Sequence, residues 1–127
     1  MMFLDEAEEI VRAICSDKFD GERASPSAFT GDNVSVSRVA ILPIQDLWRI
    51  LAEEAANPPE RILMRLGKTT VGAVLAVGEE SVPRCNLNVH ADPTDTNPAH
   101  AEIRPKITRG QANRLLKMTE LIEVSQG

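Results

Sequence analysis

Apolar residues recur at intervals of three or four along three segments of the chain, a spacing that gathers them on one face of a helix. These segments are residues 4–15, residues 44–56 and a stretch that runs from Thr108 to Ile122. The last stretch begins with Thr108 and Gln111, a T-x-x-Q pair that is typical of a capping box. The pattern therefore predicts three amphipathic helices.

Other segments have the patterns of strands, in which apolar and polar residues alternate or short apolar runs are bounded by turn residues. Gly67-Lys68 separates two of these runs, and we expect it to form a turn between them. The predicted strands are residues 34–42, 61–66, 69–77, 85–91 and 100–104.

Length and composition are those of one folded domain. The chain has 127 residues, of which 43% are hydrophobic and 26% charged, and we expect a single globular domain over 1–127. With the predicted elements, this favours an α+β fold. Its expected form is about three helices packed on one face of a mostly antiparallel sheet of about four to six strands.

Charge narrows the classes of partner. The net charge is −5, the basic residues are scattered and aromatic residues make up 3% of the chain, which makes nucleic acid an unexpected partner. The first residues, MMFLDEAEEI, are acidic where a signal peptide is basic. No apolar run has the length of about 18 residues that a membrane span needs. We therefore expect a cytoplasmic protein that does not enter a membrane.

Residues 16–33 form a long segment rich in turn residues, including Gly21, Pro26 and Gly31. A loop of this length is unusual in a small domain. Either the segment serves a function, or Phe19 and Phe29 attach it to the core. The second interpretation is favoured.

The residues with the most chemical potential lie in a predicted hairpin that spans residues 86–104. Side chains alternate between the faces of a strand, and the apolar residues of both strands must face the core. The opposite, outward face then holds Asn88, His90, Asp92, His100, Glu102 and Arg104.

Two kinds of chemistry fit this polar face, besides simple solvation. Imidazole and carboxylate groups bind zinc, iron or manganese, and the metal question stays open. A histidine that is oriented by a carboxylate can also act as a general acid or base. The candidate catalytic residues are His90, His100, Asp92 and Glu102.

Two other motifs are rejected. Gly67-Lys68-Thr69 resembles the end of a phosphate-binding loop, but position 62 is Ile where that loop has glycine. Ser25, Ser27 and Ser35 are not expected to act as nucleophiles, because the chain has no G-x-S-x-G elbow.

Three segments resemble a group of small, uncharacterised bacterial proteins with S-x-A-F, L-S-V-x-R and N-P-A-H-A-x-I elements. Here the segments are Ser27-Ala28-Phe29 with residues 34–38, residues 89–93, and residues 97–103. Val34 stands in place of the leucine, and Ser27 directly precedes Ala28. The resemblance implies a bacterial cytosolic protein, and it supplies no catalytic residue because no activity is established for the group.

Two functions follow as hypotheses. The first is a non-enzymatic interaction or regulatory module that binds a protein partner through residues 16–33 and the polar hairpin face. The second is a small hydrolase or transferase that uses the four candidate catalytic residues, with or without a metal. No other cofactor is expected, and the oligomeric state stays open. The candidate substrate- or partner-binding residues are Arg38, Arg104, Ser27, Phe29 and Asn97.

Overall fold

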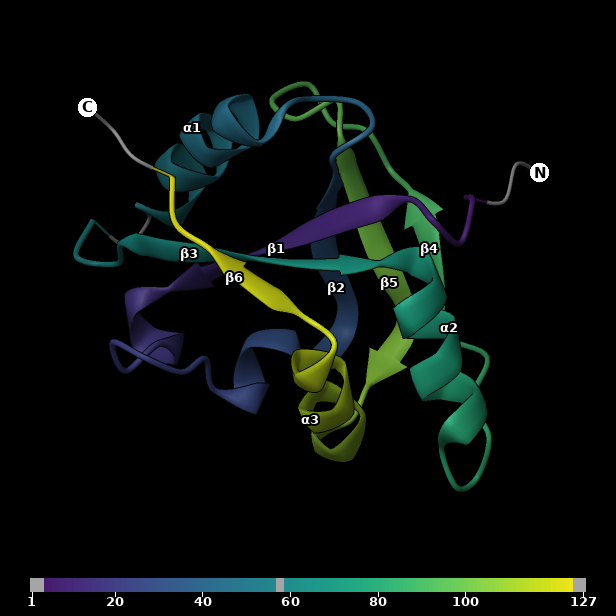
Figure 1. Ribbon diagram of the computed structural model, residues 1–127. Coiled ribbons are helices and arrows are strands. Elements are labelled where there is room, and N and C mark those ends of the chain that lie inside the picture. Colours follow the sequence, from purple (N-terminus) through teal and green to yellow (C-terminus); the bar gives the residue numbers. More distant parts are fainter. Residues whose placement is uncertain (1–3, 57–58, 125–127) are drawn as a thin grey trace.

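The fold is described by a computed structural model, which covers residues 4–56 and 59–124 (Figure 1). The elements follow in the order β1 (Glu9–Cys15), two 3-10 helices η1 (Ser16–Lys18) and η2 (Pro26–Phe29), β2 (Gly31–Arg38), α1 (Ile44–Ala55), β3 (Leu63–Thr70), α2 (Val71–Glu80), β4 (Asn88–Ala91), β5 (His100–Ile107), α3 (Arg109–Lys117) and β6 (Glu120–Ile122).

The strands form one sheet with the order β4-β5-β2-β1-β3-β6, and every neighbouring pair is antiparallel. Three α-helices and a six-stranded antiparallel sheet confirm the α+β fold class. Within the described ranges, none of the helices is both long and apolar enough to cross a membrane.

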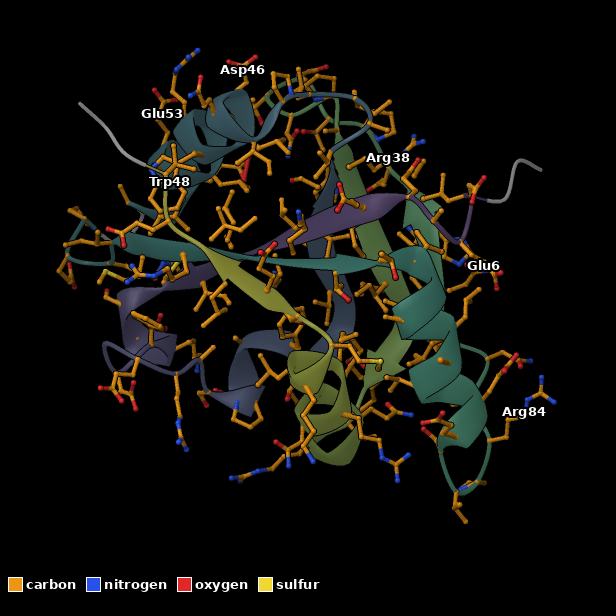
Figure 2. The ribbon with its side chains drawn as sticks, viewed as in Figure 1. Glu6, Arg38, Asp46, Trp48, Glu53 and Arg84 are labelled. Atoms are coloured by element: carbon orange, nitrogen blue, oxygen red, sulfur yellow. The ribbon has the colours of Figure 1, made fainter. Side chains whose placement is uncertain are left out.

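The helices cover both faces of the sheet, so the expectation that all of them pack on one face is wrong. Ile10 and Ile14 of β1 belong to the apolar core that contains α2, α3 and η2. Val11, the neighbour of Ile10, belongs to a second core beneath α1. Trp48 of α1, labelled in Figure 2, is buried in this second core. The sheet is therefore the middle layer between α1 and the α2–α3 pair.

The predicted helix over residues 4–15 is wrong, because residues 9–15 form the central strand β1. This strand pairs with β3 along its whole length and with β2 near its start. A strand that is buried on both faces has apolar residues on consecutive positions, and such a run also satisfies the spacing of a helix. The β-branched residues Ile10, Val11 and Ile14 are completely buried there and fit the pleated sheet well.

Residues 61–77 also differ from the prediction. Gly67 and Lys68 lie inside β3 and pair with β1 and β6, so they do not form a turn. The predicted strand over 69–77 is mostly helix α2, which begins after Thr70, whose hydroxyl accepts a hydrogen bond from the Ala73 amide (3.1 Å). Val71, Val74 and Val77 are buried at a spacing of three, which is helical.

The capping box of the last helix is confirmed. The Thr108 hydroxyl accepts from the Gln111 amide at 3.3 Å, and the Gln111 side-chain oxygen accepts from the Thr108 amide at 2.9 Å. The helix ends at Lys117, earlier than expected, because Glu120–Ile122 pairs with β3 as strand β6.

The long segment over residues 16–33 is attached to the core, as favoured above. Phe29 is completely buried, and Phe19 packs against the same apolar cluster. An isolated bridge joins Phe19 to Ala24, and the Arg65 guanidinium lies 4.7 Å from the centre of the Phe19 ring. Both phenylalanines therefore serve the fold.

Substitution by alanine is expected to change the stability in opposite directions at two helical glycines. A methyl group on Gly78 would collide with the backbone carbonyl oxygen of Cys85, whereas one on Gly110 would meet open space. Gly78→Ala is expected to lower the free energy of unfolding by about 1–3 kcal/mol through overpacking. Gly110→Ala is expected to raise it by up to about 1 kcal/mol, because alanine is the better helix former. Urea denaturation measures both, and equal effects would contradict the packing of α2 against the segment before β4.

Candidate functional site

The predicted hairpin is present, and its polar residues share one face. In the register of β4 and β5, Asn88 lies opposite Arg104 and His90 lies opposite Glu102. The residues that alternate with these, Val89, Ala101 and Ile103, are buried in the core beneath α2 and α3. The division into an apolar and a polar face is therefore confirmed.

Strand β2 extends this polar face by two serines. Ser35 lies opposite Glu102 of β5, and Ser37 lies opposite His100. Val34 and Val36, which alternate with the serines, point into the core. The β2–β5 pairing thus places Ser35 beside the histidine and carboxylates of the hairpin.

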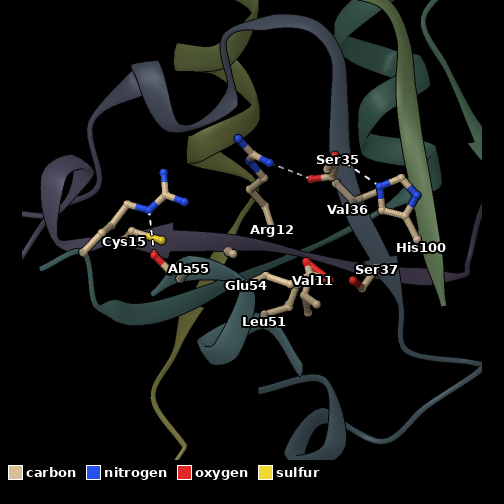
Figure 3. A pocket seen from close by; sticks show the side chains of 12 residues that line it. Val11, Arg12, Cys15, Ser35, Val36, Ser37, Leu51, Glu54, Ala55 and His100 are labelled. Atoms are coloured by element: carbon tan, nitrogen blue, oxygen red, sulfur yellow. Dashed lines mark hydrogen bonds between the residues drawn. The ribbon is translucent and has the colours of Figure 1, made fainter. Parts of the chain in front are cut away.

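His100 joins two of these polar groups through its ring nitrogens. Nδ1 lies 2.8 Å from the backbone carbonyl oxygen of Asp92 and 3.3 Å from its carboxylate oxygen Oδ2. Nε2 lies 3.2 Å from the hydroxyl oxygen of Ser35, a contact drawn in Figure 3. A carbonyl oxygen can only accept a hydrogen bond, so Nδ1 carries the proton in the neutral ring. Nε2 is then free to accept the hydroxyl proton of Ser35.

Asn97 holds the loop that precedes His100. Its side-chain amide donates to the Ser37 hydroxyl at 3.0 Å, and its side-chain oxygen accepts from the Ala99 amide at 3.0 Å. The His100 amide donates to the Asn97 carbonyl oxygen, and the Asp92 amide donates to the His100 carbonyl oxygen. Asn97 is 1% exposed and fixes the hairpin loop to β2, and its expected contact with a ligand stays a prediction.

A cavity of about 200 Å³ opens beside Ser35, between β1, β2 and the second half of α1 (Figure 3). Backbone pairing of β1 with β2 is found at Ile10↔Arg38 and Val11↔Ser37, at one end of each strand. Beyond these two pairs no further residue pairs of β1 and β2 are found in the part of the chain that the structure describes, and the Arg12 side chain of β1 donates a hydrogen bond to the backbone of β2. The polar and charged residues that line the cavity are Arg12, Cys15, Ser35, Ser37, Glu54, Arg61 and His100.

Arg12 spans the space between β1 and β2. Its Nε donates to the Ala28 carbonyl oxygen at 2.8 Å, and its Nη1 donates to the Ser35 carbonyl oxygen at 2.9 Å. Burial lowers the pKa of Arg12, the nearby Cys15 opposes this effect, and the Arg61 charge adds to it. Burial also raises the pKa of the Cys15 thiol in the same cavity. A guanidinium group is therefore held next to the backbone of Ser35.

The other predicted binding residues lie in different surroundings. Arg38 forms a bidentate ion pair with Glu8 at 2.8 and 2.9 Å, and this hydrogen bonding raises the pKa of Arg38. Arg104 binds Glu102 through Nε and Nη2 at 3.0 and 2.8 Å. The Ser27 hydroxyl is hydrogen-bonded to that of Ser25, and Phe29 is part of the core. Phe29 is completely buried, and its expected contact with a ligand stays a prediction.

Part of the polar face can also hold a metal ion. Asp92, His100 and Glu102 each offer a ligand atom, and these atoms lie within 4.8 Å of one another. His90 does not belong to this group, although it lies opposite Glu102. Glu102 is engaged by Arg104, and Nδ1 of His100 faces a carbonyl oxygen. The hydrogen bonds present thus favour proton transfer over metal ligation.

Sequence reasoning missed Ser35 and Arg12. Ser35 was set aside because no nucleophile elbow surrounds it, and only the non-local pairing of β2 with β5 brings it to His100. Its alternation with Val34 and Val36 was the available signal, since it already placed Ser35 on a polar face. Arg12 was assigned to a helix that does not form.

Comparison with known proteins adds no likeness to this geometry. No family model, curated protein or solved structure matches the chain.

The contacts of His100 predict its tautomer. The neutral ring should carry its proton on Nδ1, because that nitrogen faces the Asp92 carbonyl oxygen. Long-range ¹H–¹⁵N correlation NMR above the titration range distinguishes the two ring nitrogens. The same tautomer is expected in Asp92→Asn, since the backbone carbonyl remains. A ring protonated on Nε2 would contradict the arrangement.

Proposed function

We propose that this protein is a small hydrolase or acyl transferase in which Ser35 is the nucleophile, His100 the general base and Asp92 the group that orients His100. The observation that carries the proposal is the continuous hydrogen-bonded series from Ser35 Oγ through the His100 ring to Asp92. A nucleophile, a base within reach of it and a third group that fixes the base are the general parts of covalent catalysis by serine.

The reaction would proceed in two stages. Nε2 of His100 takes the hydroxyl proton as Ser35 Oγ bonds to the carbonyl carbon of an ester or thioester, and the tetrahedral intermediate releases its leaving group with that proton. An acyl group then stays on Ser35. Water, or another acceptor, then gives a proton to Nε2 of His100 and attacks the acyl carbon. The bond between that carbon and Ser35 Oγ breaks, and Oγ takes the proton back from His100, which restores the serine. No oxidant, reductant or metal is required.

The position of Ser35 supports access by a substrate. The side chain is exposed and lies at the edge of the 200 Å³ cavity, so an acyl group could enter from solvent. The Arg12 guanidinium donates to the Ser35 carbonyl oxygen at 2.9 Å, so the residue that carries the nucleophile has a fixed positive charge beside its backbone. Such fixed charge stabilises the oxyanion that forms during acyl transfer.

The interaction or regulatory module predicted from the sequence remains the competing function. It would use the same polar face but would not need the hydrogen-bonded order of Ser35, His100 and Asp92. A metal-dependent hydrolase is the other competitor, because Asp92, His100 and Glu102 lie close enough to share an ion. The labelling experiment below separates both from the serine mechanism.

A fluorophosphonate probe, which reacts with activated serines, should label the wild-type protein at Ser35. Mass spectrometry of the digested protein identifies the labelled residue. Ser35→Ala should abolish labelling, and His100→Gln should slow it by about 100-fold or more, as expected for loss of a general base. Thr96→Ala, an exposed hydroxyl residue outside the cavity, is the control. Labelling elsewhere, or unchanged in Ser35→Ala, would sink the proposal.

Asp92→Asn should reduce the labelling rate less than His100→Gln does. In serine proteases the equivalent amide inverts the histidine tautomer, but here the Asp92 backbone carbonyl at 2.8 Å preserves it. The rates are measured at one pH with equal probe concentration. A zinc titration runs in parallel: activity that needs zinc and survives Ser35→Ala would favour the metal mechanism.

A further inference from the structure

We propose that the cavity beside Ser35 binds a small oxyanion, a carboxylate or phosphate group, through the guanidinium groups of Arg12 and Arg61. The binding site follows from the cavity alone. The interpretation that this site recognises a substrate rests on the proposed function. In that case the substrate would be an ester or thioester that carries an anionic group close to the reacting carbonyl.

The first support is the uncompensated charge of Arg12. Its two hydrogen bonds run to neutral carbonyl oxygens of Ala28 and Ser35, and among the described residues no carboxylate forms an ion pair with it. Burial lowers the pKa of Arg12, and the one opposing influence named for it is Cys15, which is not a carboxylate. A buried charge without a counter-charge is costly, and a bound anion removes that cost.

Other partly buried arginines of this protein differ in this respect. Arg38 is paired with Glu8, Arg65 with Glu123 and Arg104 with Glu102, at distances of 2.8, 3.2 and 2.8 Å. The carboxylate partner of an arginine is thus usually supplied by the chain itself. Arg12 has no such carboxylate partner among the described residues, and it lines the cavity.

The second support is that Arg61 lines the same cavity. Its Nε donates to the Ala55 carbonyl oxygen at 2.9 Å, which anchors the side chain at the end of α1. The charge of Arg61 is near enough to lower the pKa of Arg12. Guanidinium groups bind carboxylate and phosphate groups through charge-assisted hydrogen bonds, so two of them in the wall of one cavity suit an anionic ligand.

The remaining lining sets the size and type of ligand. The Ser37 hydroxyl, which accepts from the Asn97 amide, can donate a hydrogen bond, while Val11, Leu51 and Ala55 form an apolar wall. Glu54 lines the cavity as well, and it is an exposed residue. A volume of about 200 Å³ is below the 300–1,000 Å³ typical of whole-ligand pockets, so the cavity fits an anionic group and a short chain.

The test is a ¹H–¹⁵N NMR titration of the wild-type protein with inorganic phosphate and, separately, with acetate, at ionic strength held constant with sodium chloride. Saturable shifts are expected at the amides of Arg12, Ser35 and Arg61. Arg61→Gln should weaken binding by about tenfold, the loss of one charge-assisted hydrogen bond. Arg12→Gln should do the same or more, provided that its spectrum shows a folded protein.

Two matched variants complete the design. Arg84→Gln removes an exposed arginine that extends from the surface outside the cavity (Figure 2), and it should leave binding unchanged. Glu54→Gln removes the acidic group of the cavity and should strengthen binding by about twofold, a small effect because Glu54 is exposed. The acetate and phosphate arms together show whether the site prefers the singly or the more highly charged group.

Two results would overturn the inference. One is shifts that do not saturate, or that scatter over all basic surfaces. The other is affinity that Arg61→Gln and Arg84→Gln change equally. Ser35→Ala keeps both arginines, so anion binding should persist in that variant. Binding without probe labelling would therefore reject the hydrolase and retain the site, and labelling without binding would do the reverse.

Discussion

The structure depends on a central strand that is buried on both sides. β1 lies between β2 and β3, and its alternating side chains belong to different apolar cores. Ile10 and Ile14 pack beneath α2 and α3, while Val11 packs beneath α1. The strand therefore belongs to the apolar cores of both layers of helices. The same strand contributes Arg12, so the principal cation of the cavity is placed by the element that organises the core.

The candidate site arises where two parts of the sheet meet. Strands β2, β5 and β4 present one polar face, and α1 covers the neighbouring part of the sheet over β1 and β3. Ser35 and His100 lie at the boundary, where the covered and uncovered regions adjoin. The Ser35 hydroxyl at this boundary has solvent on one side and the cavity on the other. This placement agrees with a site that receives part of a ligand and leaves the rest in water.

The sequence allowed prediction of features that depend on local order. The hairpin faces, helix α1 and the capping box of α3 follow from alternation, helical spacing and the pair Thr108 and Gln111. The helix predicted over 4–15 failed because an apolar strand buried on both faces contains the same spacings as a helix. The boundary between β3 and α2 within residues 61–77 was not predicted. Val71, Val74 and Val77 are β-branched, and residues of this kind favour a strand.

The site was only half predictable for a related reason. Asp92, His100 and Glu102 belong to one hairpin, and alternation placed them together correctly. Ser35 is distant from them in the sequence, and its approach requires β2 to pair with β5 across α1, β3, α2 and β4. No periodicity within a strand encodes which strand will be its neighbour. The position of Arg12 could not be predicted either, because the segment that contains it was predicted to be a helix and is the strand β1.

The short contact between β1 and β2 has a consequence for internal motion. Two residue pairs join these strands, whereas six join β2 to β5 and seven join β1 to β3. Local opening of a protein follows the boundary that breaks the fewest backbone hydrogen bonds. The boundary between β1 and β2 is therefore the seam at which the two halves of the sheet separate most easily. Arg12 crosses this boundary to the carbonyl oxygens of Ala28 and Ser35, so a ligand that binds Arg12 would act on the contact that joins the two strands there.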